Sequence, residues 1–439
     1  MGLVLLKNCS GGKGKPGEFN ANTLHYVGGS DTGMQLVEKD LKGISGLRAN
    51  AFKNQNISSI EIPSNIRSIG ANAFNTSLNN LKITPRIPTS SSSTMINMEA
   101  GAFANTAVRN EINITNMLGW LQCSFGDLDA NPLAQGDPRR VIEGTNIYDS
   151  KLVIPEGVER IRPRAFCHTA TFAKDIVGQS QWEGYMSAPE FPQSLTTIAT
   201  EAFKNSIGGG RLVFPDSVSS VSTDAFNGCG AYYVYFGASF PVITFRRVFG
   251  NNPDREQLEV SADNTSYYSI DNCIFEKYSH TLVWGAINSV IPTDNNITTI
   301  GSYAFMDLSG ERHNLKTLTI PDNITTIEAF AFKNNSVFNR FIIGSGITTI
   351  GSDAFNECVG LLDGYIEMQT TITSFGARSF ANIPDTPNFW INIQYNGTKQ
   401  EFKNTYKSPS WLANSAPMMV YCTDGQLEYY QSNRPRDEQ

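Results

Sequence analysis

The sequence has 439 residues, of which 40% are hydrophobic and 17% are charged, and its formal net charge is -7. The apolar content is enough to bury a core, whereas the low charged fraction implies a surface of neutral polar residues. The negative balance and the lack of a basic stripe argue against nucleic acid as a partner. No apolar run approaches the roughly 20 residues that a membrane-spanning helix needs, so we expect no membrane insertion.

The first 40 residues precede any regular pattern and are glycine-rich near their start. The apolar run at residues 2–6 is too short for the core of an export signal. The glycine-rich stretch at 11–17 lacks the spacing of a phosphate-binding loop and is interpreted as a flexible linker. We therefore predict an N-terminal cap or attachment arm over residues 1–40.

From residue 41 one phrase recurs along the chain, for example IPSNIRSIGANAF, IPEGVERIRPRAF and IPDNITTIEAFAF. A short strand pattern ends at a proline, which lacks the donor that a sheet needs, and an apolar pivot residue and an Ala-Phe pair follow. The pivots are Leu47, Ile69, Met98, Ile161, Ile198, Val221, Ile243, Ile300, Ile327, Ile350 and Phe375. We predict a β-rich α/β solenoid over residues 41–385, a right-handed superhelix with a parallel sheet along one face and a base period of 22–23 residues.

The Ala-Phe pair predicts a tight turn in which alanine permits close approach and phenylalanine fills the interior. The phenylalanines expected to stack in one buried column are Phe74, Phe203, Phe226, Phe305, Phe332 and Phe355. Longer gaps near residues 104–150 and 250–290 predict insertions that hold disguised coils, such as LEVSADN and TLVWGA. Arg247 stands where alanine is expected and suggests a bend or an irregular coil.

The repeat pattern stops after about residue 386, and residues 386–439 are predicted to form a C-terminal cap. Four aromatic residues there offer apolar surface to cover the last coil, namely Trp390, Tyr395, Phe402 and Trp411.

Candidate chemistry is sparse. Seven cysteines imply no complete disulfide framework, and Cys229 and Cys358, each three residues after a column phenylalanine, match a small buried position. The four histidines have no metal-ligand spacing, and no nucleophile is paired with a base. We therefore expect no metal, no cofactor and no enzymatic activity.

The combination of period, proline, pivot and Ala-Phe pair resembles the BspA-like class of bacterial leucine-rich-repeat surface proteins. The segments WLQCSFGDLDANPL at 120–133 and IQYNGTKQEF and VYCTDG within 393–425 also resemble parts of these proteins. The resemblance implies an extracellular or cell-surface protein that adheres to a protein or glycan on a host or neighbouring cell. The family usually carries an export signal, which is not seen at the start of this sequence.

Outward positions of the strand phrases form the expected ligand surface, and they are Glu61, Lys82, Val153, Val213, Tyr235, Thr319 and Ile342. Exposed apolar and aromatic residues in a row favour a protein or glycan partner, although strand propensity alone would also place valine and isoleucine there. The alternative function is a structural or attachment component of a virion or surface appendage, in contact with other subunits of an assembly.

Overall fold

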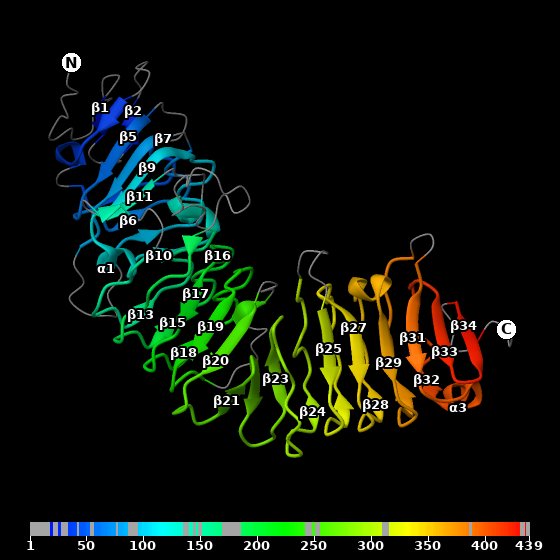
Figure 1. Ribbon diagram of the computed structural model, residues 1–439. Coiled ribbons are helices and arrows are strands. Elements are labelled where there is room, and N and C mark those ends of the chain that lie inside the picture. The colour runs from blue at the N-terminus through cyan, green and yellow to red at the C-terminus, as the bar shows by residue number, and fades with distance from the viewer. Residues whose placement is uncertain are drawn as a thin grey trace. The chain divides into compact units, whose positions relative to one another are not determined.

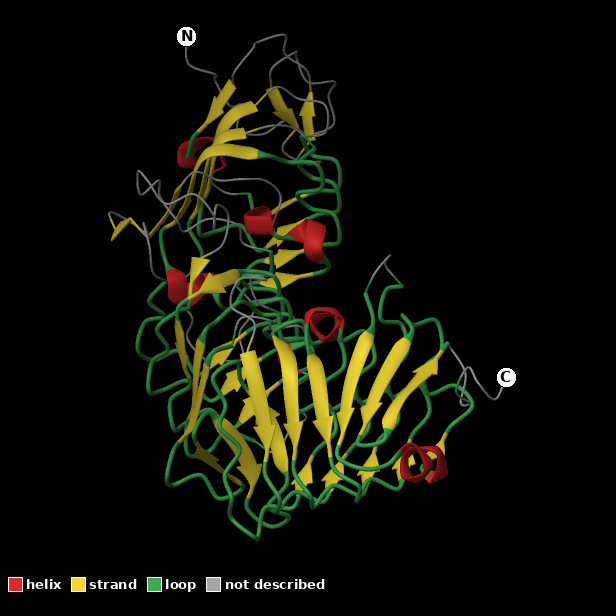
Figure 2. Ribbon diagram, turned by 45° about the vertical axis from the view of Figure 1, so that its right-hand side comes forward, coloured by secondary structure: helices red, strands yellow, loops and turns green. Residues whose placement is uncertain are grey.

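The computed structural model describes residues 18–20, 25–27, 34–41, 44–52, 57–75, 78–86, 95–134, 140–143, 146–147, 152–168, 186–241, 248–250, 255–309, 316–385, 389–430 and 435. It divides into two compact units, residues 1–231 with 239–250, and residues 232–238 with 251–439. In both units strands dominate and helix is confined to short turns (Figure 2). The predicted solenoid of parallel strands is confirmed.

The strand phrases of the first unit form a long sheet that runs from coil to coil (Figure 1). Its strands pair in parallel except for the last, which is antiparallel to its neighbour. They are β3 (Met34–Leu36), β5 (Ile57–Ile62), β7 (Leu78–Ile83), β9 (Val108–Ile114), β11 (Arg140–Glu143) and β12 (Asn146–Ile147). Ile60 pairs with Leu81 and Ile62 with Ile83, so the apolar residues of successive coils meet inside the stack.

The pivots of the first unit form separate two-residue strands on another side of each coil. One parallel set is β4 (Gly46–Leu47), β6 (Ser68–Ile69), β8 (Asn97–Met98) and β10 (Ser124–Phe125), and the other is β13 (Arg160–Ile161), β15 (Thr197–Ile198) and β18 (Ser220–Val221). The pivot itself is buried in every one of these coils. In every one of these strands except β4, where Gly46 is also buried, the residue before the pivot is half-buried or exposed and faces outward.

The other elements of the first unit are short. Its remaining strands are β1 (Glu18–Asn20) antiparallel to β2 (His25–Val27), β14 (Met186–Ser187) parallel to β16 (Ile207–Gly209), and β17 (Arg211–Val213). Its helices are α1 (Met117–Trp120) and the 3-10 helices η1 (Glu38–Leu41), η2 (Leu128–Ala130) and η3 (Pro132–Ala134). In the segment WLQCSFGDLDANPL, the buried Trp120 donates its indole N–H to the carbonyl of Ala165 at 3.3 Å, which ties this segment to the next coil.

The second unit repeats the two-sheet plan. Its long sheet is β25 (Lys316–Ile320), β27 (Phe338–Ile343), β29 (Tyr365–Met368), β31 (Ile391–Tyr395), β33 (Met418–Cys422) and the antiparallel β34 (Gly425–Tyr429). Its second sheet is β21 (Tyr267–Ile270), β22 (Cys273–Glu276), β23 (Leu282–Gly285), β24 (Thr299–Ile300), β26 (Thr326–Ile327), β28 (Thr349–Ile350), β30 (Ser374–Phe375) and β32 (Tyr406–Lys407). β19 (Tyr233–Phe236) pairs in parallel with β20 (Gln257–Val260), and the helices are η5 (Val359–Asp363) and α3 (Lys399–Asn404).

Both segments predicted to hold disguised coils contain strands of the stack. The LEVSADN segment supplies part of β20, and the TLVWGA segment supplies β23, which pairs in parallel with β24. The parallel ladder also continues beyond residue 385 through β31 and β33 before β34 ends it. Ile243 and Arg247 lie outside the described residues.

The predicted phenylalanine column is confirmed in each unit. All six phenylalanines named from the sequence have no exposed surface. In the second unit the ring centroids of Phe305, Phe332, Phe355 and Phe380 follow one another at 5.2, 5.0 and 5.2 Å, with the rings stacked. The first unit repeats the arrangement from Phe166 through Phe203, Phe226 and Phe249.

The Ala-Phe turns are held by a third ladder of backbone hydrogen bonds. The amides of Phe330, Phe332 and Asn334 donate to carbonyls of the next coil at 2.8–3.0 Å. This ladder uses alternate residues. Phe330 and Asn334, which lie two residues before and two residues after Phe332, have positive φ values of 62° and 55°. Asparagine and aspartate adopt this conformation at low cost, which accounts for their frequency in these turns.

The position three residues after the column phenylalanine is a buried donor. Cys229, Asn335 and Cys358 each donate from the side chain to the carbonyl of the column phenylalanine in the preceding coil. Both thiols are free and fully buried. The interpretation of Cys229 and Cys358 as equivalent small buried residues is therefore confirmed.

Candidate functional site

The outward positions of the long sheets are the surface that the sequence nominates, and the structure distributes them over several places. In the first unit Glu61 and Lys82 are direct neighbours across β5 and β7 and form a half-exposed ion pair at 3.5 Å. Glu61 also accepts a hydrogen bond from the backbone amide of Glu38 at 3.0 Å. The two charges of this pair are already partnered with each other, and a surface ion pair of this kind contributes little to the free energy of folding on its own.

Val153 and Val213 are exposed, at 46% and 42%, but the structure does not bring them together. Val153 forms an isolated parallel bridge with Glu190, whereas Val213 ends β17. Tyr235 is half-buried on β19 between the buried Val234 and Phe236, as expected, and it pairs with Glu259 of β20. None of these three positions lies in the sheet that holds Thr319 and Ile342.

Thr319 and Ile342 do form the start of a row. Thr319 of β25 pairs with Ile342 of β27, and the ladder continues to Glu367, Gln394 and Tyr421 on β29, β31 and β33. These strands lie side by side in Figure 1, from yellow to red. Their inward neighbours are buried, so the five side chains project from one face at the spacing of a parallel sheet, about 4.8 Å. We call this set the outer row.

The sequence reasoning missed the last three members of the outer row. Each lies in an alternating strand pattern, YIEM, INIQY and MMVYC, that could have identified it. The Ala-Phe landmark is lost after Phe380, because Trp411 packs on Phe380 in place of a further phenylalanine. The landmark therefore ends before the sheet does, which accounts for Gln394 and Tyr421 but not for Glu367, whose coil has the recognised pivot Phe375.

A cation–π contact between neighbouring strands lies beside the outer row. Arg340 of β27 pairs with Tyr365 of β29, and its guanidinium carbon lies 4.5 Å from the centroid of the Tyr365 ring. A cation over an aromatic face is attracted by the ring's electrostatic quadrupole, which orders both side chains.

A groove opens at the ends of β25 and β27, next to Thr319 and Ile342. Its volume is 430 Å³, and its lining includes Thr293, Asn295, Thr319, Asp322, Ile342 and Gln369. It therefore spans four successive coils and contains two of the residues predicted from the sequence. One carboxylate oxygen of Asp322 accepts from the backbone amide of Ser345 at 2.6 Å, and the Gln369 amide oxygen accepts from Asn396 at 3.1 Å.

One of the coils that line the groove departs from the repeat. Where the preceding coil reads Pro321-Asp322-Asn323, this coil reads Gly344-Ser345-Gly346. A Cβ on Gly344 would lie 2.7 Å from the Asp322 carboxylate and from the Pro321 backbone, so the two coils approach too closely for a side chain. Glycine at this position therefore permits the close approach of the two coils beside the groove.

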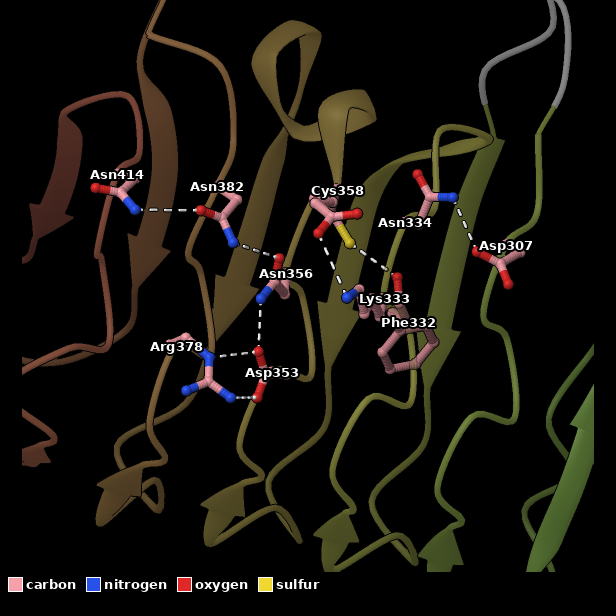
Figure 3. Close-up of polar contacts among 11 residues, drawn as sticks. Asp307, Phe332, Lys333, Asn334, Asp353, Asn356, Cys358, Arg378, Asn382 and Asn414 are labelled. Atoms are coloured by element: carbon pink, nitrogen blue, oxygen red, sulfur yellow. Dashed lines mark hydrogen bonds and ion pairs between the residues drawn. The ribbon is translucent and has the colours of Figure 1, made fainter. Parts of the chain in front are cut away.

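The Ala-Phe turns present a different face, in which polar side chains bond to one another (Figure 3). Asn334 donates to Asp307 at 2.8 Å, and Asn382 donates to Asn356 at 3.2 Å. Further pairs are the bidentate Arg378–Asp353 contact and the Lys333–Glu357 ion pair. In contrast, the side chains of Thr319, Gln394 and Tyr421 make no hydrogen bond or ion pair with any described residue.

The described cysteines do not offer reactive thiolates. Burial raises the pKa of the Cys123, Cys229, Cys273 and Cys358 thiols to about 12, so these groups stay protonated. Cys9 lies outside the described residues. Among the residues that the structure covers, no three histidine, cysteine or acidic side chains gather in a way that could hold a metal ion.

Comparison with known proteins gives one family match. The model of the BspA type leucine-rich repeat region matches in six copies, over residues 41–124, 181–281 and 282–407. Curated protein sequences gave no match. Within the described part of the chain, no helix combines the length and apolar character needed to cross a membrane.

Solved structures of similar fold come from several bacteria. A leucine-rich cell-surface protein from Faecalibacterium prausnitzii is 18% identical, with 88% of this chain and 94% of that chain covered and a TM-score of 0.41. A leucine-rich-repeat protein from Bacteroides ovatus is 15% identical, with 85% and 90% covered and a TM-score of 0.35. The pneumococcal vaccine antigen PcpA is 13% identical, with 91% and 78% covered and a TM-score of 0.30.

Proposed function

We propose that this chain, which belongs to the family of proteins with BspA-type leucine-rich repeats, is an adhesion protein that binds a macromolecule on the long sheet of its second unit. The ligand is a protein or glycan of a host or neighbouring cell, and the protein acts at the cell surface or outside the cell. Family membership supports this location and this class of function.

The outer row is the observation that carries the proposal. Thr319, Ile342, Gln394 and Tyr421 combine hydroxyl, apolar, amide and aromatic groups, and Tyr421 is 47% exposed. Because hydrogen-bonded strands fix the backbone at these positions, little backbone entropy is lost when a partner binds, and the cost is confined to the side chains. The turn face is a weaker candidate, since its polar groups are already paired between coils.

The proposed role is a non-enzymatic one. Repeat scaffolds present broad surfaces, and function has to be argued from the groups that a surface holds. The outer row holds one carboxylate, Glu367, and no base or nucleophile beside it. Such a surface can recognise a partner through complementarity, and we propose that it does so without the paired acid and base that catalysis of proton transfer uses.

A charge-insertion experiment tests the proposal. The chain is passed over immobilised purified matrix proteins and neutral and acidic glycans, and its binding is measured by biolayer interferometry. In the sheet variant Thr319→Glu, Ile342→Glu and Gln394→Glu are combined. We expect its affinity for the bound probe to fall by about 10-fold or more, because three further carboxylates join Glu367 in the contact and must be desolvated.

The matched control adds the same three charges to the second sheet of the same coils, as Thr326→Glu, Thr349→Glu and Tyr406→Glu. These positions are also outward, on β26, β28 and β32. The control is expected to bind like the parent chain, and both variants should keep the parent's circular dichroism. Loss of binding in the control with normal binding by the sheet variant would place the ligand elsewhere.

A further inference from the structure

We propose that the groove beside Thr319 and Ile342 is a subsite for a neutral glycan and takes one or two sugar rings. The inference rests on the proposed binding function of the same sheet and names the chemical class of the ligand. The groove spans the ends of β25, β27 and β29 and has a volume of 430 Å³, within the usual range for ligand sites.

The hydrogen-bonding groups around the groove match hydroxyl groups. The Thr293 and Thr319 hydroxyls each donate and accept, and the Asn295 amide offers a donor and an acceptor side by side. The side chains of these three residues make no hydrogen bond or ion pair with any described residue. Adjacent hydroxyls of a sugar ring each donate and accept as well, so they can pair with this set without leaving a buried group unsatisfied.

Asp322 determines which ligand charge the groove prefers. It is the one charged residue among the described residues that line the groove. One of its oxygens accepts from the Ser345 amide, which holds the carboxylate in place. The carboxylate forms charge-assisted bonds with hydroxyl donors and repels phosphate, sulfate or carboxylate groups, so a neutral sugar is favoured over an acidic one.

The apolar part of the lining is small and lies between the polar groups. Pro321 and Ile342 are half-buried and supply surface for the C–H face of a ring. No aromatic residue and no arginine is among the described residues of the lining. Because those side chains dominate the anchoring of protein partners, the groove itself suits a saccharide better than a peptide.

The test uses the full chain and defined probes. Neutral di- to tetrasaccharides of glucose, galactose, mannose and N-acetylglucosamine are presented on an array beside sialylated and sulfated oligosaccharides. A neutral probe that binds is then titrated by calorimetry against Thr319→Phe, which fills the groove, and Asp322→Asn, which removes the charge but keeps an acceptor for Ser345. The control is Thr317→Phe, an outward change on the same strand that does not line the groove.

We expect at least one neutral saccharide to bind, with affinity reduced about 10-fold or more by Thr319→Phe and several-fold by Asp322→Asn, and unchanged by Thr317→Phe. Thr319→Val, which removes only the hydroxyl, covers the case in which the larger side chain disturbs folding, and it should weaken binding several-fold. Binding only to acidic probes, no saccharide binding, or binding unaffected by the Thr319 variants would overturn the inference. If a matrix protein binds and is lost in the sheet variant while no saccharide binds, the inference fails and the proposed function stands.

Discussion

The rings of Phe355 and Phe380 lie 5.2 Å apart and are parallel to within 1°. They come from successive coils, and each is completely buried. A ring inside the column, such as Phe332 or Phe355, thus packs against a ring above and a ring below. Removal of one ring from the middle leaves two neighbours without a partner.

The first prediction concerns Phe332, which stacks between Phe305 and Phe355. We expect Phe332→Ala to lower the free energy of unfolding by about 3–5 kcal/mol, because it removes a buried ring and leaves a cavity. Urea unfolding followed by circular dichroism measures the change. The control is Phe389→Ala, since Phe389 is 42% exposed, and a change within about 0.5 kcal/mol is expected there. Equal losses in the two variants would contradict the column.

The second prediction concerns Gly346, which stands where the preceding coil has Asn323. A Cβ on Gly346 would press against the carbonyl oxygens of Asp322 and Ile324, which are backbone atoms of the neighbouring coil. We expect Gly346→Ala to cost about 1–3 kcal/mol of stability through overpacking. Ser345→Ala, at an exposed position that keeps its backbone amide, serves as the control. An unchanged urea midpoint for Gly346→Ala would show that the coils can separate freely.

The third prediction concerns Lys407, which takes the place of the apolar pivot in the last coil of the second sheet. Its side chain is only 5% exposed, and its ammonium donates to the carbonyls of Phe402 and Thr405 at 2.6 and 2.9 Å. Burial lowers the pKa of this ammonium from 10.5 to about 8. Between these two pKa values the unfolded chain binds more protons than the folded one, so stability rises with pH across that window.

The measurement compares the parent chain with Lys407→Met in urea unfolding at several pH values. From about pH 7.5 to about pH 10, the free energy of unfolding of the parent should rise by roughly 2 kcal/mol relative to that of the variant, since one unit of pKa shift corresponds to 1.36 kcal/mol. Below about pH 7.5 the difference should be flat, because Lys407 is charged in both states. Parallel pH profiles for the two proteins would show that the amine is solvated in the folded state.

The parts of the fold that sequence predicted are those repeated in every coil. Ile327 and Phe332 recur at fixed spacing because each has to meet its equivalents above and below, so both were recognisable as buried. Lys407 was not recognisable, since a lysine at an inward position breaks the apolar template. Its burial depends on the carbonyls at the end of α3, which no periodicity encodes.

The site was predicted only in part, for a similar reason. The outward direction of Thr319 and Ile342 followed from strand alternation, but which coils share one sheet depends on the intervening segments. Val153 and Val213 therefore looked equivalent to Thr319 although they join no common row with it. At the groove one coil has Gly344 and Gly346 where the preceding coil has Pro321 and Asn323, a difference that alignment of the two coils would have revealed.

The buried ammonium of Lys407 also limits how this chain can change its length. A coil duplicated between β28 and β30 would present isoleucine or phenylalanine pivots to both neighbours, as the existing coils do. A coil added after β32 would instead enclose the ammonium between two apolar pivots, with only the carbonyls of Phe402 and Thr405 to accept its hydrogen bonds. Gene duplication can therefore lengthen the protein within the array more easily than at the end of its second sheet.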